Sequence, residues 1–382
     1  MLTEACHHAS EQESSQFVKL EDLENEPSNL GDFSPWSYKP ACASLQDDEE
    51  AICVYTNASF GHGRGISIFT TPEIAAQFAE LPPFHDAAVL EDTNKNSGLW
   101  YTTQLPSKGV GMLAKKVLKR GDLITAYTPA LLVYIDERMS TPDREKYLRV
   151  AINQLPPATR DAYLSLSTIY GNVDMIVQDV LKANTFEMEI GGHMHLAIFP
   201  EPARINHECT PNSQYTIDST HLTHSVYAAR QIEAGEEITI PYTSPFQPHS
   251  SRQAHLQEAF HFTCACSLCS SSSSDEILLQ ISNIQQTLGD WSPTSTATTK
   301  LVEKLISLYE KLRLHAFMDT AYGYAALTYS AVGNVKKTKK FGELAMEASG
   351  IRLGKSGQDY VMWEEMRRSP ENHWSWRRRL RS

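Results

Sequence analysis

The pattern of apolar positions changes character along the chain. In the first third, short β-branched runs alternate with turns, and residues 51–55 (AICVY) and 66–68 (ISI) predict strands. Thr71 and Pro72 then supply the N-cap and first turn of a helix that stops before Pro82. The first third of the chain therefore reads as short strands, turns and one short helix.

The middle third mixes the two periodicities. Residues 136–182 are predicted to be helical, because Thr141-Pro142-Asp143 and Pro156-Pro157 are helix start signals. Residues 195–200 (HLAIFP) form a buried-strand run, and 225–229 and 238–240 are shorter strands with a turn at Gly235. Several short strands with an inserted helical block predict the α+β fold class.

The last third has helical spacing. A serine run at 270–274 reads as a linker, and Ile277, Leu278, Ile281 and Ile284 then fall on one helical stripe. Residues 321–345 resemble one tetratricopeptide (TPR) repeat. One such unit cannot bury its apolar face alone, so we expect the helical domain to pack on the preceding one. The basic end, 367–382, is expected to be a solvated or docking tail, with a nuclear signal as the alternative.

Composition limits the function classes. The 382 residues suffice for two or three domains, and the net charge of −12 disfavours direct nucleic-acid binding, which needs many cation–phosphate contacts. We expect no membrane partner either, because no apolar run approaches the roughly 20 residues of a membrane span. Residues 1–50 hold twelve acidic residues and two lysines, and they predict a disordered acidic arm that is solvated or binds a partner.

The cysteines bear on the compartment. There are seven, and the N-terminus lacks the basic-then-apolar order of a signal peptide. An odd count without such a signal argues against a disulfide framework and favours the reducing cytoplasm or nucleus. Cys264, Cys266 and Cys269 form a C-x-C-x-x-C cluster of the kind that binds zinc, so zinc is the expected staple.

The stretch 204–242 carries the candidate chemistry. It opens with Asn206-His207-x-Cys209-x-Pro211-Asn212 and closes with Gly235-Glu236-Glu237-Ile238 and Tyr242. An amide, an imidazole and a thiol within four residues suit neither a helix face nor an amphipathic strand, so this segment reads as backbone bent around a ligand.

RINHECTPN, GEEITIPY and FTCACSLC, in this order and spacing, resemble the catalytic half of SET-domain lysine methyltransferases, in particular SMYD-like and fungal SET proteins. The resemblance covers roughly 105–270. The zinc-binding MYND insert of animal SMYD proteins is absent, because residues 51–105 contain only Cys53.

The resemblance implies a domain plan and a metal site. It divides the chain into an arm (1–50), a SET domain (51–270), a TPR-like helical domain (275–366) that walls the substrate cleft, and the tail (367–382). Within the SET domain, 136–182 is the helical insert and 243–270 the post-SET segment. By resemblance, Cys209 joins the cysteine trio as the fourth ligand of a structural zinc.

The resemblance also assigns the remaining site residues. Tyr242 is the catalytic residue and also contacts S-adenosylmethionine, whose other contacts are implied to be Lys108, Gly109, Gly111, Asn184, Asn206, His207 and Phe262. The first three would contribute mainly backbone, and the glycine run 61–65 is a rival for this role. Phe199 and Phe260 are implied to line the substrate channel. Glu236 and Glu237 read as structural, pairing with backbone or an arginine such as Arg204.

The expected function is methyl transfer from S-adenosylmethionine to the side-chain amine of a lysine in a protein partner, histone or not. SMYD relatives commonly carry tyrosine where this chain has Phe260, so the pocket loses one hydroxyl. That loss could alter the number of methyls added, and it leaves two alternatives open. One is a SET-fold enzyme acting on a small molecule, and the other is a non-catalytic interaction protein.

Overall fold

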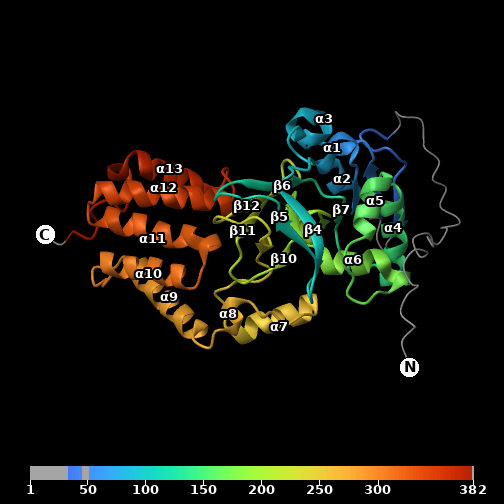
Figure 1. Ribbon diagram of the computed structural model, residues 1–382. Coiled ribbons are helices and arrows are strands. Elements are labelled where there is room, and N and C mark those ends of the chain that lie inside the picture. Colours follow the sequence, from blue (N-terminus) through green and yellow to red (C-terminus); the bar gives the residue numbers. More distant parts are fainter. Residues whose placement is uncertain (1–32, 45–50, 381–382) are drawn as a thin grey trace, which may run out of the picture.

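The computed structural model describes residues 33–44 and 51–380 (Figure 1). The fold is α+β, with the strands in the first two thirds of the chain and a helical region at the C-terminal end. The largest sheet has six strands in the order β1-β2-β3-β7-β9-β8. Its strands are β1 (Ala41–Ser44), β2 (Ala51–Asn57), β3 (Ile66–Thr70), β7 (Leu131–Val133), β8 (Phe186–Ile190) and β9 (His193–Ile198).

Both faces of this sheet are buried. Ile52 and Val54 contribute to one core cluster, and Cys53 and Tyr55 contribute to the other. Because successive side chains of a strand point to opposite faces, a strand covered on both sides reads as a continuous apolar run.

Helices from two parts of the chain cover the two faces. Leu148 of α4 and Val180 of α6 pack on the face that bears Ile52, whereas Phe78 of α2 packs on the opposite face. The Thr71 hydroxyl accepts a hydrogen bond from the Ile74 amide at 3.3 Å, which confirms the predicted N-cap of α2. The helices here are α1 (Phe60–Gly63), α2 (Pro72–Ala79), α3 (Pro82–His85), α4 (Thr141–Asn153), α5 (Pro157–Leu164) and α6 (Ile176–Asn184), with 3-10 turns η1 (Ala87–Leu90) and η2 (Val173–Met175).

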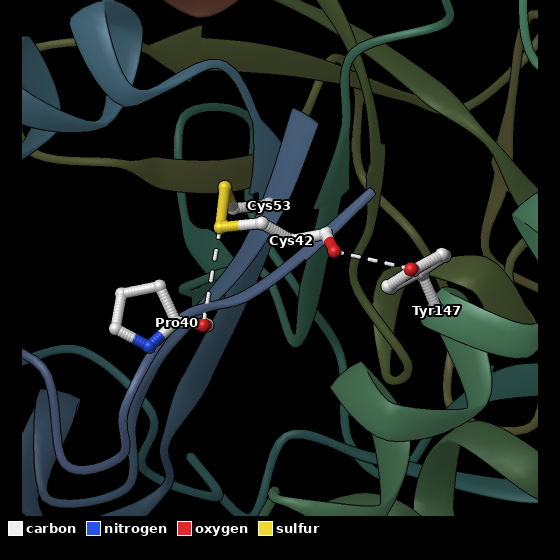
Figure 2. Close-up of a disulfide and its surroundings, with 4 residues drawn as sticks. All are labelled: Pro40, Cys42, Cys53 and Tyr147. Carbon is white, nitrogen blue, oxygen red and sulfur yellow. Dashed lines mark hydrogen bonds between the residues drawn. A yellow bond between two sulfur atoms is a disulfide. The ribbon is translucent and has the colours of Figure 1, made fainter. Parts of the chain in front are cut away.

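A disulfide joins Cys42 of β1 to Cys53 of β2 (Figure 2). The two residues are direct partners in the antiparallel register, so their side chains lie on the same face of adjacent strands. The Tyr147 hydroxyl of α4 donates a hydrogen bond to the Cys42 carbonyl at 3.1 Å (Figure 2). The inference from the odd cysteine count was therefore wrong for this pair, because strand register brings the two cysteines together.

The N-terminal boundary also differs from the expectation of one disordered arm over 1–50. Residues 33–44 are placed against the sheet, where the Trp36 ring lies 5.3 Å from Tyr55 and 5.4 Å from Phe84 between centroids. Residues 1–32 and 45–50 lie outside the described part of the chain.

Three smaller sheets build the region around 204–242. One is the β4–β5 hairpin, one has the order β11-β12-β6, and one is the parallel pair β10–β13. Met112, Ile124, Val226 and Ile238 from these segments share one apolar cluster. The bounds are β4 (Trp100–Leu105), β5 (Gly109–Ala114), β6 (Leu123–Tyr127), β10 (Asn206–His207), β11 (Ser213–Asp218), β12 (Thr223–Ala228) and β13 (Thr239–Ile240), and the 3-10 turn η3 (Pro202–Arg204) precedes β10.

The C-terminal region is helical and packs on the strand-rich part. Ile281 of α9 and Leu305 of α10 belong to its core. The Gln214 amide donates to the Ala316 carbonyl at 3.2 Å, which links β11 to this region. The elements are α7 (His249–Phe260), α8 (Ser267–Ser270), α9 (Ser274–Gly289), α10 (Thr299–Lys311), η4 (His315–Phe317), α11 (Met318–Ala331), α12 (Val335–Arg352), α13 (Gln358–Arg368) and η5 (Pro370–Asn372); α11 and α12 form the helical pair that the sequence compares to a TPR unit.

The basic tail docks onto this region. The Arg379 guanidinium lies 3.9 Å from the centroid of the Trp291 ring and donates to the carbonyls of Leu288 and Asp290 at 2.8 and 2.7 Å. Of the two expectations for the tail, solvated or docking, these contacts support a docked tail over the described residues. None of the described helices combines the length and the apolarity needed to cross a bilayer.

Candidate functional site

The segments at the two ends of 204–242 lie side by side. Parallel pairing of β10 with β13 places Asn206 opposite Thr239 and His207 opposite Ile240. Tyr242 then follows β13 by two residues, and it is fixed twice to the first segment. Its backbone amide donates to His207 Nδ1 at 2.9 Å, and its hydroxyl donates to the Ile205 carbonyl at 2.7 Å. The structure thus brings Asn206, His207 and Tyr242 together.

Burial fixes the charge states of these two rings. Desolvation lowers the pKa of His207 to about 4, so its imidazole is neutral at neutral pH. Because Nδ1 accepts a hydrogen bond, the ring proton lies on Nε2, which is 3.2 Å from the Cys209 sulfur. Burial, with the nearby Glu237 carboxylate, raises the pKa of Tyr242, so the phenol keeps its proton. That proton is donated to Ile205, which leaves the lone pairs of the oxygen free to accept.

Two cavities meet at Tyr242. Cavity A has a volume of about 530 Å³ and is lined on one side by Phe186, Glu187 and Tyr215. Cavity B has a volume of about 580 Å³ and is lined by Lys108, His207 and Phe262, among others. The linings of the two cavities share Ser167, Ala183, Asn206, Tyr242 and Phe260. Tyr242 and Phe260 therefore stand at the boundary between two adjoining spaces.

Aromatic rings form this boundary. The centroid of Phe260 lies 4.8 Å from that of Tyr242 and 6.5 Å from that of Phe262. Phe262 in turn lies 6.0 Å from His207. Phe260 is the last residue of α7, and Phe262 lies just beyond the end of that helix. The C-terminal end of α7 thus returns to Tyr242.

Phe199, expected in the substrate channel, does not line either cavity. Its side chain is fully buried and packs against Phe186 at 5.8 Å and His224 at 5.0 Å between centroids. This is a correction: Phe199 is a core residue one layer behind the wall. Phe186 and Tyr215 occupy the wall itself, and the sequence analysis missed both. The alternation of Tyr215 and Ile217 on β11, both of which line cavity A, was the available signal.

Gly111 of β5 permits a close approach of segments, whereas a side chain at Gly109 would meet nothing within 4 Å. Gly109 has φ of +72°, a conformation that favours glycine. A side chain at Gly111 would lie within 2.9 Å of the Asn206 amide nitrogen and would also collide with Leu105. The rival run is elsewhere in the fold, where Gly65 packs against Pro156. Neither residues 61–65 nor Gly109 and Gly111 line the two cavities, although Val110 between the last two lines cavity A.

Lys108 and Asn206 are held by the same carboxylate. Glu237 accepts from Lys108 Nζ at 2.7 Å and from the Asn206 side-chain amide at 2.9 Å. The predicted structural role of Glu237 is therefore tied to Lys108, and Glu236 pairs with Arg230 at 2.6 Å. Arg204 is not the partner of either; it donates to the carbonyl and hydroxyl of Ser165.

Asn184 is used differently from the expectation. It lines cavity A, but its amide nitrogen donates to the carbonyls of Ser167 at 2.8 Å and Val180 at 2.7 Å. The side chain thus closes the end of α6 onto the loop that follows α5. In this arrangement it shapes the wall of cavity A, and it is not among the residues that line cavity B.

Four cysteine sulfurs converge beside cavity B. Cys209, Cys264, Cys266 and Cys269 each offer a sulfur, and all four sulfurs lie within 4.8 Å of one another. Sulfurs bound at about 2.3 Å to one tetrahedral ion lie about 3.8 Å apart. The sulfur of Cys209 is 4.0 Å from that of Cys264 and 3.6 Å from that of Cys269, so the set fits a tetrahedral zinc ion. The position of Cys209 agrees with its expected place in the cluster.

Comparison with known proteins agrees with this geometry. Residues 109–243 match the family model described as SET domain. The histone-lysine N-methyltransferase set5 of Schizosaccharomyces pombe is 33% identical over 178 residues, covering 45% of this chain and 50% of that protein. The N-lysine methyltransferase SMYD2 of Homo sapiens is 30% identical over 129 residues, covering 34% of this chain and 28% of that protein.

A further relative, the SET domain-containing protein SmydA-8 (isoform A) of Drosophila melanogaster, is 40% identical over 94 residues, covering 24% of this chain and 20% of that protein. The chain thus spans half or less of the length of these relatives. The family match includes both segments of the tyrosine-centred site and stops one residue beyond Tyr242. Residues 109–243 of this chain thus match the SET-domain model, and the chain is similar over part of its length to the lysine methyltransferases set5 and SMYD2.

Proposed function

We propose that this protein transfers a methyl group from S-adenosylmethionine to the side-chain amine of a protein lysine. The observation that carries the proposal is the pair of cavities that adjoin at Tyr242. Methyl transfer needs two reactants held in line from opposite sides of one point, and it needs little covalent help from the protein. Two adjoining cavities with a buried phenol between them meet that need.

Cavity B is the proposed site of the cosubstrate. When bound, S-adenosylmethionine supplies a methyl group on a sulfonium sulfur. A neutral amine can attack that methyl carbon, and the sulfur then leaves as a thioether. The Asn206 amide, held by Glu237, and the neutral His207 ring offer fixed polar contacts there. Lys108 provides a cation for a carboxylate, and Phe262 covers one side of the cavity. Gly109 and Gly111 do not line the cavity, and Gly111 supports it by letting β5 approach Asn206 closely. Asn184 lines cavity A and not cavity B, so its proposed role is to shape the wall of the adjoining cavity.

Cavity A is the proposed site of the lysine. The rings of Phe186, Tyr215 and Phe260 attract a cationic amine, and Glu187 adds a carboxylate to the same lining. The amine enters as the cation and must lose its proton to solvent before it attacks, because only the neutral amine has a free lone pair. The Tyr242 oxygen, with its own proton donated to Ile205, accepts from the amine and from the polarised methyl hydrogens.

The cysteine cluster is proposed to hold a structural zinc. Zinc there would bind the segment that carries Phe260 and Phe262 to Cys209, and so would keep the aromatic boundary assembled. The name of the set5 relative makes a histone one candidate substrate protein. We propose the cytoplasm or nucleus as the compartment, although a disulfide such as Cys42–Cys53 is uncommon in those reducing environments.

A labelling experiment tests the proposed function. The full chain is incubated with methyl-labelled S-adenosylmethionine and either core histones or a cell lysate, and label is followed into protein and into small molecules. We expect label in protein lysine. Label confined to small molecules would instead support the alternative acceptor.

Tyr242→Phe sharpens the test. We expect a loss of rate on the order of 10²-fold, because a preorganised polar group at the reacting centre is lost. Tyr227→Phe is the matched control, since Tyr227 is a half-buried tyrosine of β12 that lines neither cavity. Calorimetry with S-adenosylmethionine should give similar affinities for both variants, and an unchanged rate in Tyr242→Phe would remove that residue from the mechanism.

A further inference from the structure

Arg252 is the largest fully buried side chain among the described residues, and nothing in the proposed transfer step uses it. It lies on α7 with an exposed fraction of 0%. One guanidinium nitrogen, Nη1, donates to the carbonyls of Gln247 and Pro245. The other, Nη2, points at the Cys269 sulfur at 3.7 Å.

The charge of Arg252 is poorly balanced by carboxylates. The nearest, Asp275, lies 3.7 Å from Nη1, is about half exposed, and already accepts two hydrogen bonds from the His249 amide at 3.1 and 3.0 Å. A cation removed from water is costly unless a nearby anion and hydrogen bonds replace its hydration. Asp275 and two carbonyls alone replace the lost hydration of the guanidinium only weakly.

The cysteine cluster supplies the missing negative charge. Four thiolates around one divalent ion carry a net charge of −2, and Cys269 is one of the four. A guanidinium that donates to a thiolate sulfur makes a charge-assisted hydrogen bond, which is stronger than a neutral one. The burial of Arg252 is therefore explained when Cys269 is a metal-bound thiolate, and it is unexplained when Cys269 is a neutral thiol.

We propose that Arg252 is the counter-charge of the metal–thiolate cluster, and that its hydrogen bond to Cys269 sets how tightly zinc is held. This inference rests on the proposed zinc site. Arg252 is a positioning residue: through the carbonyls of Pro245 and Gln247 it also ties the cluster to the segment that follows Tyr242. Loss of the arginine should thus loosen the metal and the adjacent wall of cavity B together.

The experiment measures zinc affinity in the purified, reduced full chain by competition with a chromophoric zinc chelator. Arg252→Gln should bind zinc about 10- to 100-fold more weakly, the range seen when a hydrogen-bond partner of a metal ligand is removed. Arg252→Lys should lie between Arg252→Gln and wild type, because it keeps the charge and loses the planar fork. Arg368→Gln is the control, since Arg368 is an exposed arginine in an i,i+4 ion pair on α13, and it should match wild type.

Asp275→Asn separates the cluster from the ion pair. If Arg252 acts through Cys269, this variant should keep zinc affinity within about fivefold, the scale of an exposed ion pair. If Arg252 served mainly to pair with Asp275, the asparagine variant would reproduce the full loss of Arg252→Gln, and that result would overturn the inference.

Unfolding measured with and without a zinc chelator tests whether Arg252 acts through the metal or only stabilises the fold. Zinc bound only by the folded state adds stability according to its affinity, so the difference between wild type and Arg252→Gln should shrink when zinc is removed. Equal differences in both conditions, or wild-type zinc affinity in a folded Arg252→Gln, would contradict the inference. If Arg252→Gln does not fold, the lysine variant decides, and wild-type affinity there would count against the hydrogen bond. A wild-type chain that takes up no zinc would remove the zinc site first, whatever the outcome for methyl transfer.

Discussion

The chain holds two groups of cysteines that the fold uses in different ways. Cys42 and Cys53 face each other across adjacent strands and form a disulfide. Cys209, Cys264, Cys266 and Cys269 gather from two segments, and none of them is oxidised to a pair. Register between two strands selects one partner, whereas a bent segment and a C-x-C-x-x-C turn direct four sulfurs to one point. Cysteine therefore attaches an edge strand through a disulfide in one place and holds a cavity wall together through a four-sulfur cluster in the other.

The largest expected effect comes from breaking the cluster. Cys209→Ser should lower zinc affinity by several orders of magnitude, because a structural zinc needs four ligands and its binding free energy in small domains is on the order of 10 kcal/mol. Methyl transfer should fall with it, since the segment that carries Phe262 loses its attachment. Zinc content per chain by mass spectrometry checks this. One zinc per chain in the serine variant would contradict the four-cysteine site.

A smaller effect is expected from opening the disulfide. Cys42→Ala with Cys53→Ala should lower the free energy of unfolding by about 2–3 kcal/mol, the loop-closure value for a short loop. Zinc content should not change, because the pair lies in a different part of the fold. Urea unfolding followed by circular dichroism measures the loss. A change in zinc content would show that the disulfide and the four-cysteine cluster are not independent.

Thiol counting tests the division directly. In a Cys6→Ser background, the chain denatured with a zinc chelator and without reductant should take up four alkyl groups, and six after reduction. Six before reduction would mean that Cys42 and Cys53 are both thiols, as expected of a cytoplasmic protein. That result would support the inference from the odd cysteine count that the chain has no disulfide framework.

The smallest effect is expected at Tyr147. Tyr147→Phe removes the hydrogen bond to the Cys42 carbonyl and should cost about 0.5–1 kcal/mol of unfolding free energy, the usual net value of such a bond. The shift in the urea midpoint measures it. Phe69 stacks on the Tyr147 ring and should be unaffected, so a loss above the range of the disulfide variant would show that β1 depends on α4 more than on β2.

The sequence located the cysteine trio through its local spacing, whereas Cys209 and Tyr242 were assigned from the family resemblance. Cys264, Cys266 and Cys269 are close along the chain, and the amide–imidazole–thiol segment is distinctive in any context. The α+β class followed from the succession of short strands and a helical block, and the helices of 136–182 followed from their start signals. The disulfide did not, because it depends on the register of β1, which lies within a stretch whose acidic composition masks a strand.

Phe199 shows a different limit. It follows a run buried on both faces of the six-stranded sheet, so apolar periodicity cannot say which side a residue faces. Phe186 and Tyr215 reach cavity A from β8 and β11, strands of different sheets, and only tertiary packing places them in one wall. Likewise, the basic composition of the tail said nothing about its stacking on Trp291.

The hydrogen bond from Tyr242 to Ile205 has a consequence for inhibitor design. A hydroxyl whose hydrogen is already engaged presents only electron pairs to a visiting molecule. Compounds that place an amine or amide N–H at this point should gain affinity, and ethers or ketones of the same shape should be rejected. The selectivity would come from the orientation of one hydrogen atom rather than from the size of the pocket.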